Sequence, residues 1–208
     1  MTAVLRPPLR LVSWLAASWR RAGALVGVMA VSMWAVFAID AEFLRRTGAP
    51  TPDTQNALTL PQATGQLAAW DDGTARLYAG FAAVDFVFPL AASLVLAVVA
   101  HRLVVLGERW PGPAVPRGVA LVCLLPALFD YAENVGFLAA LATGDELPVQ
   151  VALVAKSLEL ATIGLSGGLL AVLAAVLAAR FVALRLVRRD GVRGDGRRAG
   201  SSAHDPAS

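Results

Sequence analysis

Ionisable side chains interrupt three long apolar segments of the sequence. This polar set comprises Tyr78, Asp85, Asp130, Glu133, Asn134, Lys156 and Glu159. A charged side chain at the centre of a bilayer is unfavourable by about 2.5–3.5 kcal/mol on insertion scales. Such groups therefore turn inward, pair with one another and attract water, and they usually serve a function. We expect these side chains to form a ligand- or ion-binding site.

The spacing of the polar set places its members on shared helix faces. Asp130, Glu133 and Asn134 follow one another at i, i+3 and i+4, so they project from one side of a helix. Tyr78 and Asp85 are seven residues apart and also share a side. The lysine and the second glutamate are three residues apart on a third segment. Three helices that turn these faces toward one another would gather the whole set.

The distance of each charge from the basic end of its segment indicates its depth in the bilayer. At about 1.5 Å per helical residue, Asp85, Asp130 and Glu133 lie roughly 25, 20 and 24 Å from that end. The hydrocarbon core is about 30 Å thick, so these acids fall in one layer in its outer third. Lys156 and Glu159 fall at or just beyond the edge of this layer unless their helix tilts, which so long an apolar segment favours.

A single lysine cannot neutralise the four acids of the polar set. Lys156 is the expected partner of Asp85 or Glu133, and the sequence does not distinguish between them. The remaining negative charge requires protonation, a bound cation or exposure to water. We assign no catalytic residue, cofactor or metal ligand, because the sequence contains no recognisable set of nucleophile, base and orienting group.

Three functions are compatible with such a cluster. The first is a binding or translocation site for a small molecule, ion or proton, open to the exoplasmic side. The second is a small intramembrane enzyme that uses two carboxylates as general acid and base on a lipid-like substrate. The third is a non-catalytic assembly subunit in which the charges form a structural ion-pair network. We favour the first, because ionisable residues inside membranes are rare and usually functional.

The elements that carry the polar set are long apolar helices. Of 208 residues, 57% are hydrophobic and 16% are charged, with a mean hydropathy of +0.64, whereas soluble domains contain about 25% charged residues. About 20 apolar residues cross a bilayer as a helix. Four segments qualify, at 22–39, 77–100, 118–141 and 149–179. We expect one all-α, four-helix membrane bundle over residues 1–188 and a disordered polar tail at 189–208.

Arginine counts predict the orientation of this bundle. Fourteen arginines lie before the first segment, between the second and third, or after the fourth, whereas three lie in the other connections. The positive-inside rule then places both termini in the cytoplasm and the long loop 40–76 outside. The chain is thus expected to be a multi-pass protein of the cell membrane.

Shorter features refine this arrangement. Residues 8–20 carry Leu and Trp at helical spacing between arginines, which predicts an interfacial helix or an extension of the first membrane helix. Residues 60–77 are expected to hold a short helix over the bundle. Pro89 and Pro126 stand inside apolar segments and should kink the second and third membrane helices beside the acids.

Small residues mark places where helices can approach one another. GxxxG motifs occur at Gly23 and Gly27 and again at Gly164 and Gly168. Such motifs allow close backbone contact between membrane helices. In a chain with four helices we expect them to serve packing within the bundle rather than dimerisation.

The expected partners follow from the same composition. They are the lipid bilayer and a small-molecule, lipid or cation ligand, and a homo-oligomer is compatible with the sequence. The net charge of +3 gives no reason to expect binding to nucleic acid. The lone Cys123 excludes an internal disulfide, and one cysteine with two histidines excludes a zinc site of the Cys/His type.

Overall fold

Long helices account for most of the described chain. The computed structural model describes residues 5–110 and 113–199, with the backbone alone for 186–199. The described residues are 86% helical and form no strand. Four stretches are long and apolar enough to cross a membrane: Trp19–Thr47, Asp72–Gly107, Arg117–Thr143 and Glu146–Arg185. The prediction of an all-α chain with four long apolar helices is therefore confirmed.

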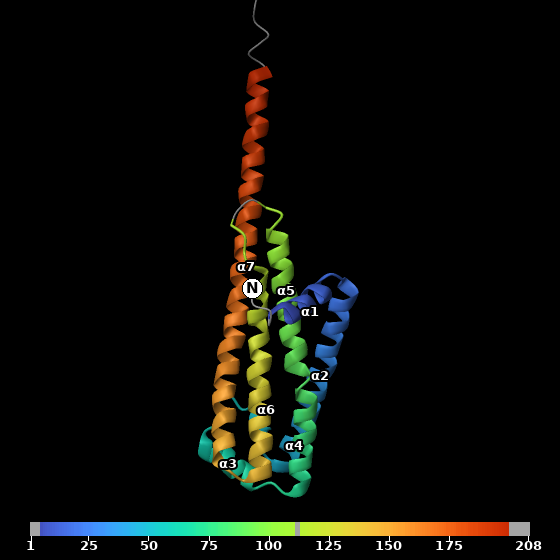
Figure 1. Cartoon of the computed structure of the whole chain (residues 1–208), viewed down its shortest axis with the longest axis vertical. Coiled ribbons are helices and arrows are strands. Elements are labelled where there is room, and N and C mark those ends of the chain that lie inside the picture. The colour runs from blue at the N-terminus through green and yellow to red at the C-terminus, as the bar shows by residue number, and fades with distance from the viewer. Residues whose placement is uncertain (1–4, 111–112, 200–208) are drawn as a thin grey trace, which may run out of the picture.

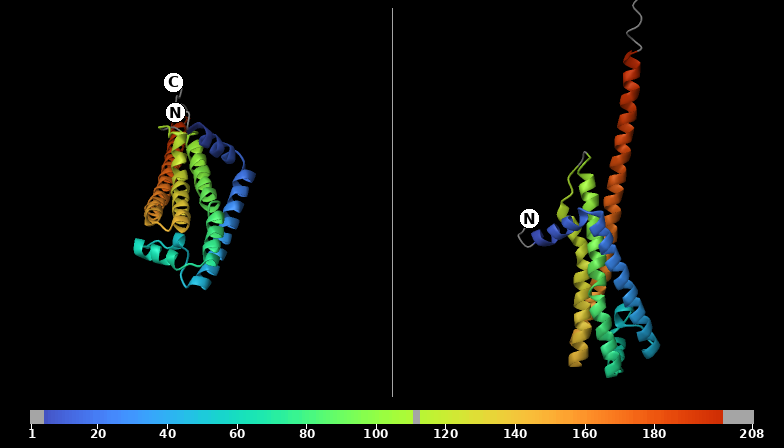
Figure 2. Two further views of the ribbon diagram at one scale, coloured as in Figure 1. Left: turned by 60° about the horizontal axis from the view of Figure 1, so that its bottom comes forward. Right: turned by 90° about the vertical axis from the view of Figure 1, so that its right-hand side faces the viewer.

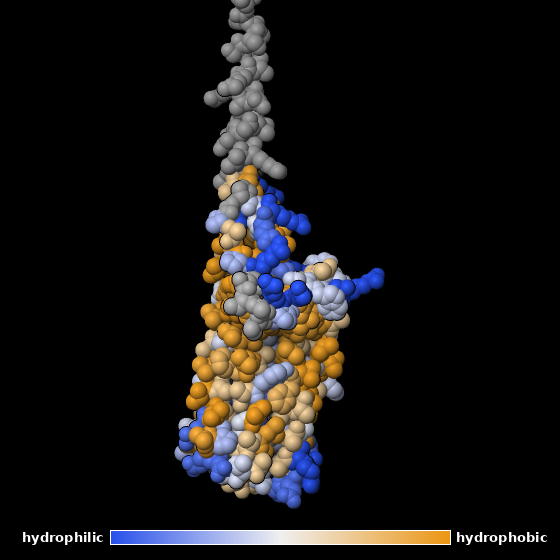
Figure 3. Space-filling model, in the orientation of Figure 1, coloured by the Kyte–Doolittle hydropathy of each residue, from blue (hydrophilic) through white to orange (hydrophobic). Residues whose placement is uncertain are grey.

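The four long stretches run side by side as a bundle (Figure 1). The elements are α1 (Arg6–Ala16), α2 (Trp19–Thr47), η2 (Pro52–Thr54), α3 (Leu60–Ala68), α4 (Asp72–Asp85), α5 (Phe88–Gly107), η3 (Arg117–Leu124), α6 (Leu125–Thr143) and α7 (Glu146–Ala199). α3 lies at one end of the bundle against α7, and α1 crosses the other end against α5 (Figure 2). Apolar side chains cover the middle of the face in Figure 3, with hydrophilic ones gathered toward its two ends.

The prolines interrupt two of the long helices and do not merely kink them. α4 ends at Asp85, and α5 starts after a break of two residues with Pro89 in its first turn. Pro126 likewise stands in the first turn of α6, directly after the 3-10 helix η3. Proline is tolerated in a first turn because the backbone N–H that it lacks has no partner there. At the α4–α5 break the Tyr131 hydroxyl donates to the carbonyl oxygen of Phe86 at 2.7 Å, which satisfies a released backbone group.

The predicted loop 40–76 is shorter in the structure. α2 continues to Thr47, and α4 already begins at Asp72, so the connection spans residues 48–71 and contains η2 and α3. α2 ends where Gly48 adopts a left-handed conformation with φ of 78°. The predicted short helix at 60–77 corresponds to α3 followed by the start of α4.

The chain ends of the bundle also differ from the predicted bounds. Extended backbone at Ser18 separates α1 from α2, so most of the predicted segment 8–20 lies in a separate helix and only its last two residues belong to the first membrane helix. α7 continues to Ala199, well past the other helices, whereas we expected the fourth helix to end at 179 and disorder to begin at 189 (Figure 2). No proline occurs between residues 149 and 199 to stop it. Residues 200–208 of the predicted tail lie outside the described residues.

The GxxxG motifs do not serve packing within the bundle, contrary to our expectation. A Cβ atom added at Gly23, Gly27, Gly164 or Gly168 would meet no heavy atom within 4 Å. Of the described glycines, Gly136 on α6 has the least space: an added Cβ would lie 2.9 Å from the Cβ of Ala152 and from the carbonyl oxygen of Pro148 on α7.

Replacing Gly136 by alanine should therefore destabilise the bundle by about 1–3 kcal/mol, as overpacking against backbone typically does. Thermal unfolding in mild detergent measures the effect. The matched control is Gly164→Ala on α7, where open space surrounds the position and the gain in helix propensity should leave stability unchanged or higher. Equal melting temperatures for the two variants would contradict the close α6–α7 contact.

Candidate functional site

An asparagine joins the two aspartates that stand on different helices. Asn134 on α6 is fully buried, and its Nδ2 donates to Oδ2 of Asp85 at 2.9 Å and to Oδ2 of Asp130 at 3.1 Å. The two carboxylate oxygens are therefore at most 6.0 Å apart. The side-chain oxygen Oδ1 of Asn134 has no hydrogen-bond partner among the described residues, although it is buried. The pair of aspartates thus shares one donor beside an unused acceptor.

The lysine pairs with α6 and with the loop. Lys156 Nζ donates to Oε1 of Glu133 at 2.9 Å, and both side chains are almost completely buried. The same ammonium donates to the backbone carbonyl oxygen of Asp53, in the 3-10 helix η2. Of the two partners left open by the sequence, the structure selects Glu133. Lys156 thereby connects α7 to α6 and to the loop that covers this end of the bundle.

Asp53 is a member of the cluster that the sequence did not reveal. Both of its carboxylate oxygens are buried, and neither has a hydrogen-bond partner in the described part of the chain. Burial and the nearby charge of Asp85 raise the pKa of Asp53 from its ordinary value of 3.8 to about 7. The hydroxyl of Tyr78 lies near enough to oppose this rise in the pKa, but its geometry does not meet that of a hydrogen bond.

Polar contacts hold the Asp53 loop in place. Asp40 on α2 accepts from the backbone N–H of Thr51 at 2.8 Å and from its hydroxyl at 2.7 Å. Gln55 and Gln66 both donate to the carbonyl oxygen of Pro50, at 2.8 and 2.9 Å. The loop is thus attached to α2 and α3 independently of its contact with the lysine.

Aromatic rings fix the tyrosine at the edge of the cluster. Tyr78 on α4 is fully buried among Phe43, Trp70, Phe81 and Phe137, with ring centroids 5.1 to 6.5 Å away. Such ring pairs stabilise a core beyond the area they bury. Its hydroxyl oxygen is buried without a partner in the described residues. The hydroxyl is therefore a positioned, unused polar group.

The structure gathers the whole predicted polar set in one region. Glu159 follows the lysine by one helical turn on α7, is half-buried and interacts electrostatically with Lys156 and Asp85. With Asp53 the region holds five acids and one lysine. The sequence signal for Asp53 is Pro52, which favours a fixed turn directly before it. This signal does not tell which way the turn faces.

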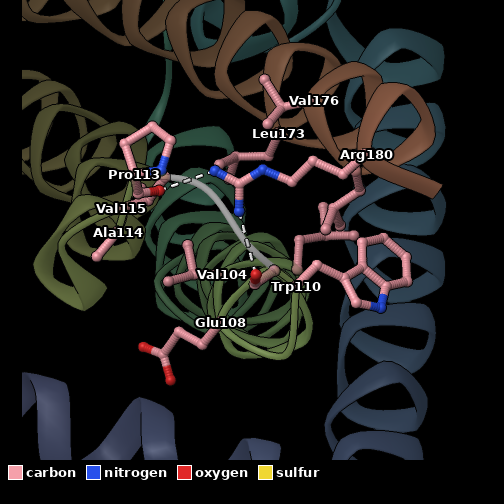
Figure 4. Close-up of a pocket in the computed structure, with 12 residues that line it drawn as sticks. Val104, Glu108, Trp110, Pro113, Ala114, Val115, Leu173, Val176 and Arg180 are labelled. Carbon is pink, nitrogen blue, oxygen red and sulfur yellow. Dashed lines mark hydrogen bonds between the residues drawn. The ribbon is translucent and has the colours of Figure 1, made fainter. Parts of the chain in front are cut away.

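The described pockets lie away from this cluster. They lie at α1, between α1, α2 and α5, and between α5 and α7. Figure 4 shows the third, a cavity of about 140 Å³ in which Arg180 donates to the carbonyl oxygens of Gly107 and Pro113, at 3.1 and 2.8 Å. None of them provides the apolar slot beside the acids that an enzyme acting on lipid would need.

Metal binding and similarity to known proteins give no further assignment. Within residues 5–110 and 113–185, no three Asp, Glu, His or Cys side chains converge as metal ligands would. Comparison of the chain with protein-family models, with curated proteins and with solved structures finds no match. The site must therefore be interpreted from its own geometry.

Proposed function

We propose that this chain is a multi-pass protein of the cell membrane, with both termini in the cytoplasm, and that its acidic cluster binds a small cation or a proton from the exoplasmic side. Three observations support the membrane placement: the four long apolar helices, the apolar middle of the face in Figure 3 and the uneven distribution of arginine. The acids then occupy the end of the bundle that carries few arginines.

The observation that carries the binding proposal is a set of buried polar atoms without partners. These atoms are both carboxylate oxygens of Asp53, the hydroxyl of Tyr78 and Oδ1 of Asn134. Buried polar groups normally find hydrogen bonds, so unused acceptors beside an excess of acids favour a positively charged ligand. The absence of converging metal ligands in the described residues favours a proton or a monovalent cation over a divalent metal.

The test is the melting temperature in mild detergent at alkaline pH with sodium, potassium or N-methyl-D-glucamine chloride at equal ionic strength. A cation that binds only the folded chain stabilises it by about 2.7 kcal/mol at a hundred times its Kd. For a cation as the ligand, we expect sodium or potassium to raise the melting temperature. For a proton as the ligand, we expect acidification to raise it. Asp130→Asn should remove the response to sodium or potassium and reduce the response to pH to the part that Asp53 contributes. It should melt at or above the wild type, because it relieves the crowding with Asp85.

Asp145→Asn is the matched control, because Asp145 is an exposed acid in the turn that joins α6 to α7. This variant should keep the full response to cations and pH. If neither cations nor pH separate the wild type from Asp130→Asn, the cluster is a structural network and the binding proposal is wrong.

A further inference from the structure

We infer that the groove between α1, α2 and α5, at the opposite end of the bundle, binds one anionic glycerophospholipid. The groove has a volume of about 1050 Å³, and ligand sites typically measure about 300–1,000 Å³. This inference goes beyond the acidic cluster and does not depend on it.

The groove is apolar along its length, and its lining residues on α5 recur with helical periodicity. On α5 it is lined by Val95, Val98, Val99 and Arg102, which recur at i, i+3, i+4 and i+7 and so share one face. From Val95 to Arg102 the helix rises about 10 Å, so an acyl chain can lie along it. On the α2 side Gly23 forms part of the wall and leaves open space.

Two guanidinium groups stand at the polar end of this groove. Arg102 donates from Nε to the carbonyl oxygen of Ala16 at 3.0 Å and stacks on the ring of Trp19, 3.6 Å from its centroid. These contacts hold the group in place and leave its terminal nitrogens without a hydrogen bond in the described chain. Arg109 follows seven residues later, in the turn after the end of α5; it is exposed and has no ion-pair partner among the described residues.

The chemistry of the lining favours an anionic headgroup. No acidic side chain is among the lining residues, whereas Arg102 and Arg109 are. A fixed guanidinium matches a phosphate oxygen pair in geometry and charge. His101 also lines the groove, and its Nδ1 is buried without a partner in the described residues. An apolar groove that ends in paired cations fits an acyl chain with a phosphate headgroup and a net negative charge.

Native mass spectrometry of the full chain in mild detergent tests the inference, with phosphatidylglycerol and phosphatidylcholine of identical acyl chains as probes. We expect one phosphatidylglycerol molecule to be retained in preference to phosphatidylcholine. Arg109→Gln should weaken that retention about tenfold, the order of a lost charge-assisted hydrogen bond. Arg102→Gln should weaken it further, but this residue also holds α1, so Arg109 carries the test.

Two matched pairs complete the experiment. Arg185→Gln removes the same charge from α7 outside the groove and should leave lipid retention unchanged. Gly23→Leu adds a side chain at the wall of the groove, where its Cβ would meet no heavy atom within 4 Å. Gly27→Leu, one turn further along α2, adds the same side chain outside the lining. Equal retention of the two lipids, or equal effects within either pair, would show unspecific contact with surrounding lipid and overturn the inference.

Discussion

Replacing Lys156 by methionine should lower the free energy of unfolding by about 3–5 kcal/mol, the range measured when one partner of a buried ion pair is removed. Glu133 is 2% exposed and would keep a buried carboxylate without its partner. The carbonyl oxygen of Asp53 would also lose its donor. Methionine nearly preserves the side-chain volume, so the loss would reflect the charge and not a cavity. Chemical or thermal unfolding in mild detergent measures it.

The double variant Lys156→Met with Glu133→Gln separates the ion pair from other effects. Removing the carboxylate as well should recover part of the lost stability, and the difference between the single and double variants gives the coupling between the two side chains. If Lys156→Met melts like the wild type and the second change adds nothing, the pair does not hold α6 against α7.

The cluster therefore contains groups with different roles. Lys156 and Glu133 satisfy one another and connect two helices, which is the behaviour of a structural pair. Asp85 and Asp130 share a single amide donor, and no cation among the described residues forms an ion pair with either. The proposed binding function rests on this second group and on Asp53. Variants of the two groups should consequently change stability in opposite directions.

Helical periodicity and the estimated depths were enough to predict that acids from neighbouring helices lie in one layer. Asp85 and Asp130 belong to different helices, yet their estimated depths already place them in one layer, and the structure brings both to the amide of Asn134. The same reasoning could not choose between Asp85 and Glu133 as the partner of Lys156. That choice depends on how α6 is rotated against α7, with Gly136 facing Pro148 and Ala152, and spacing within one helix carries no information about it.

Loops and helix ends were the features that the sequence could not predict. Asp53 lies in a segment without periodicity, so nothing in its spacing shows that the chain folds back over the bundle. Its position depends on hydrogen bonds from Thr51 to Asp40, eleven residues earlier. The sequence predicts kinks at Pro89 and Pro126, whereas the helices are interrupted there. Whether a proline kinks a helix or begins a new one depends on whether neighbouring groups, such as Tyr131, satisfy the freed backbone.

Replacing Asp53 by asparagine should make the protein less sensitive to rising pH. The pKa of Asp53 is about 7 in the folded chain and 3.8 is its ordinary value, so between these values the folded chain holds a proton that the unfolded chain has released. Folding stability then falls as the pH rises through this window. The loss amounts to about 1.4 kcal/mol per pH unit, or about 4 kcal/mol in total. Asp53→Asn removes this dependence.

Unfolding of the wild type and of Asp53→Asn, measured in mild detergent from pH 4 to pH 8, gives the difference directly. The stability of the variant relative to the wild type should rise with pH up to about 7 and then stay constant. A constant burial penalty of the new amide shifts this curve but does not change its slope. A difference that does not vary with pH would mean that Asp53 is not protonated in the folded chain.

Asp71 provides a control with the opposite sign. Its carboxylate accepts from the backbone N–H of Thr74 at 2.7 Å at the start of α4, and this hydrogen bond lowers the pKa of Asp71 below its ordinary value. Asp71 therefore stabilises the folded chain above its ordinary pKa, and this contribution is lost as the pH falls. Asp71→Asn should be less stable than the wild type at neutral pH, and the gap should close on acidification. Opposite slopes for two aspartates in one connection would distinguish the buried carboxylate of Asp53 from a general effect of acid on the bundle.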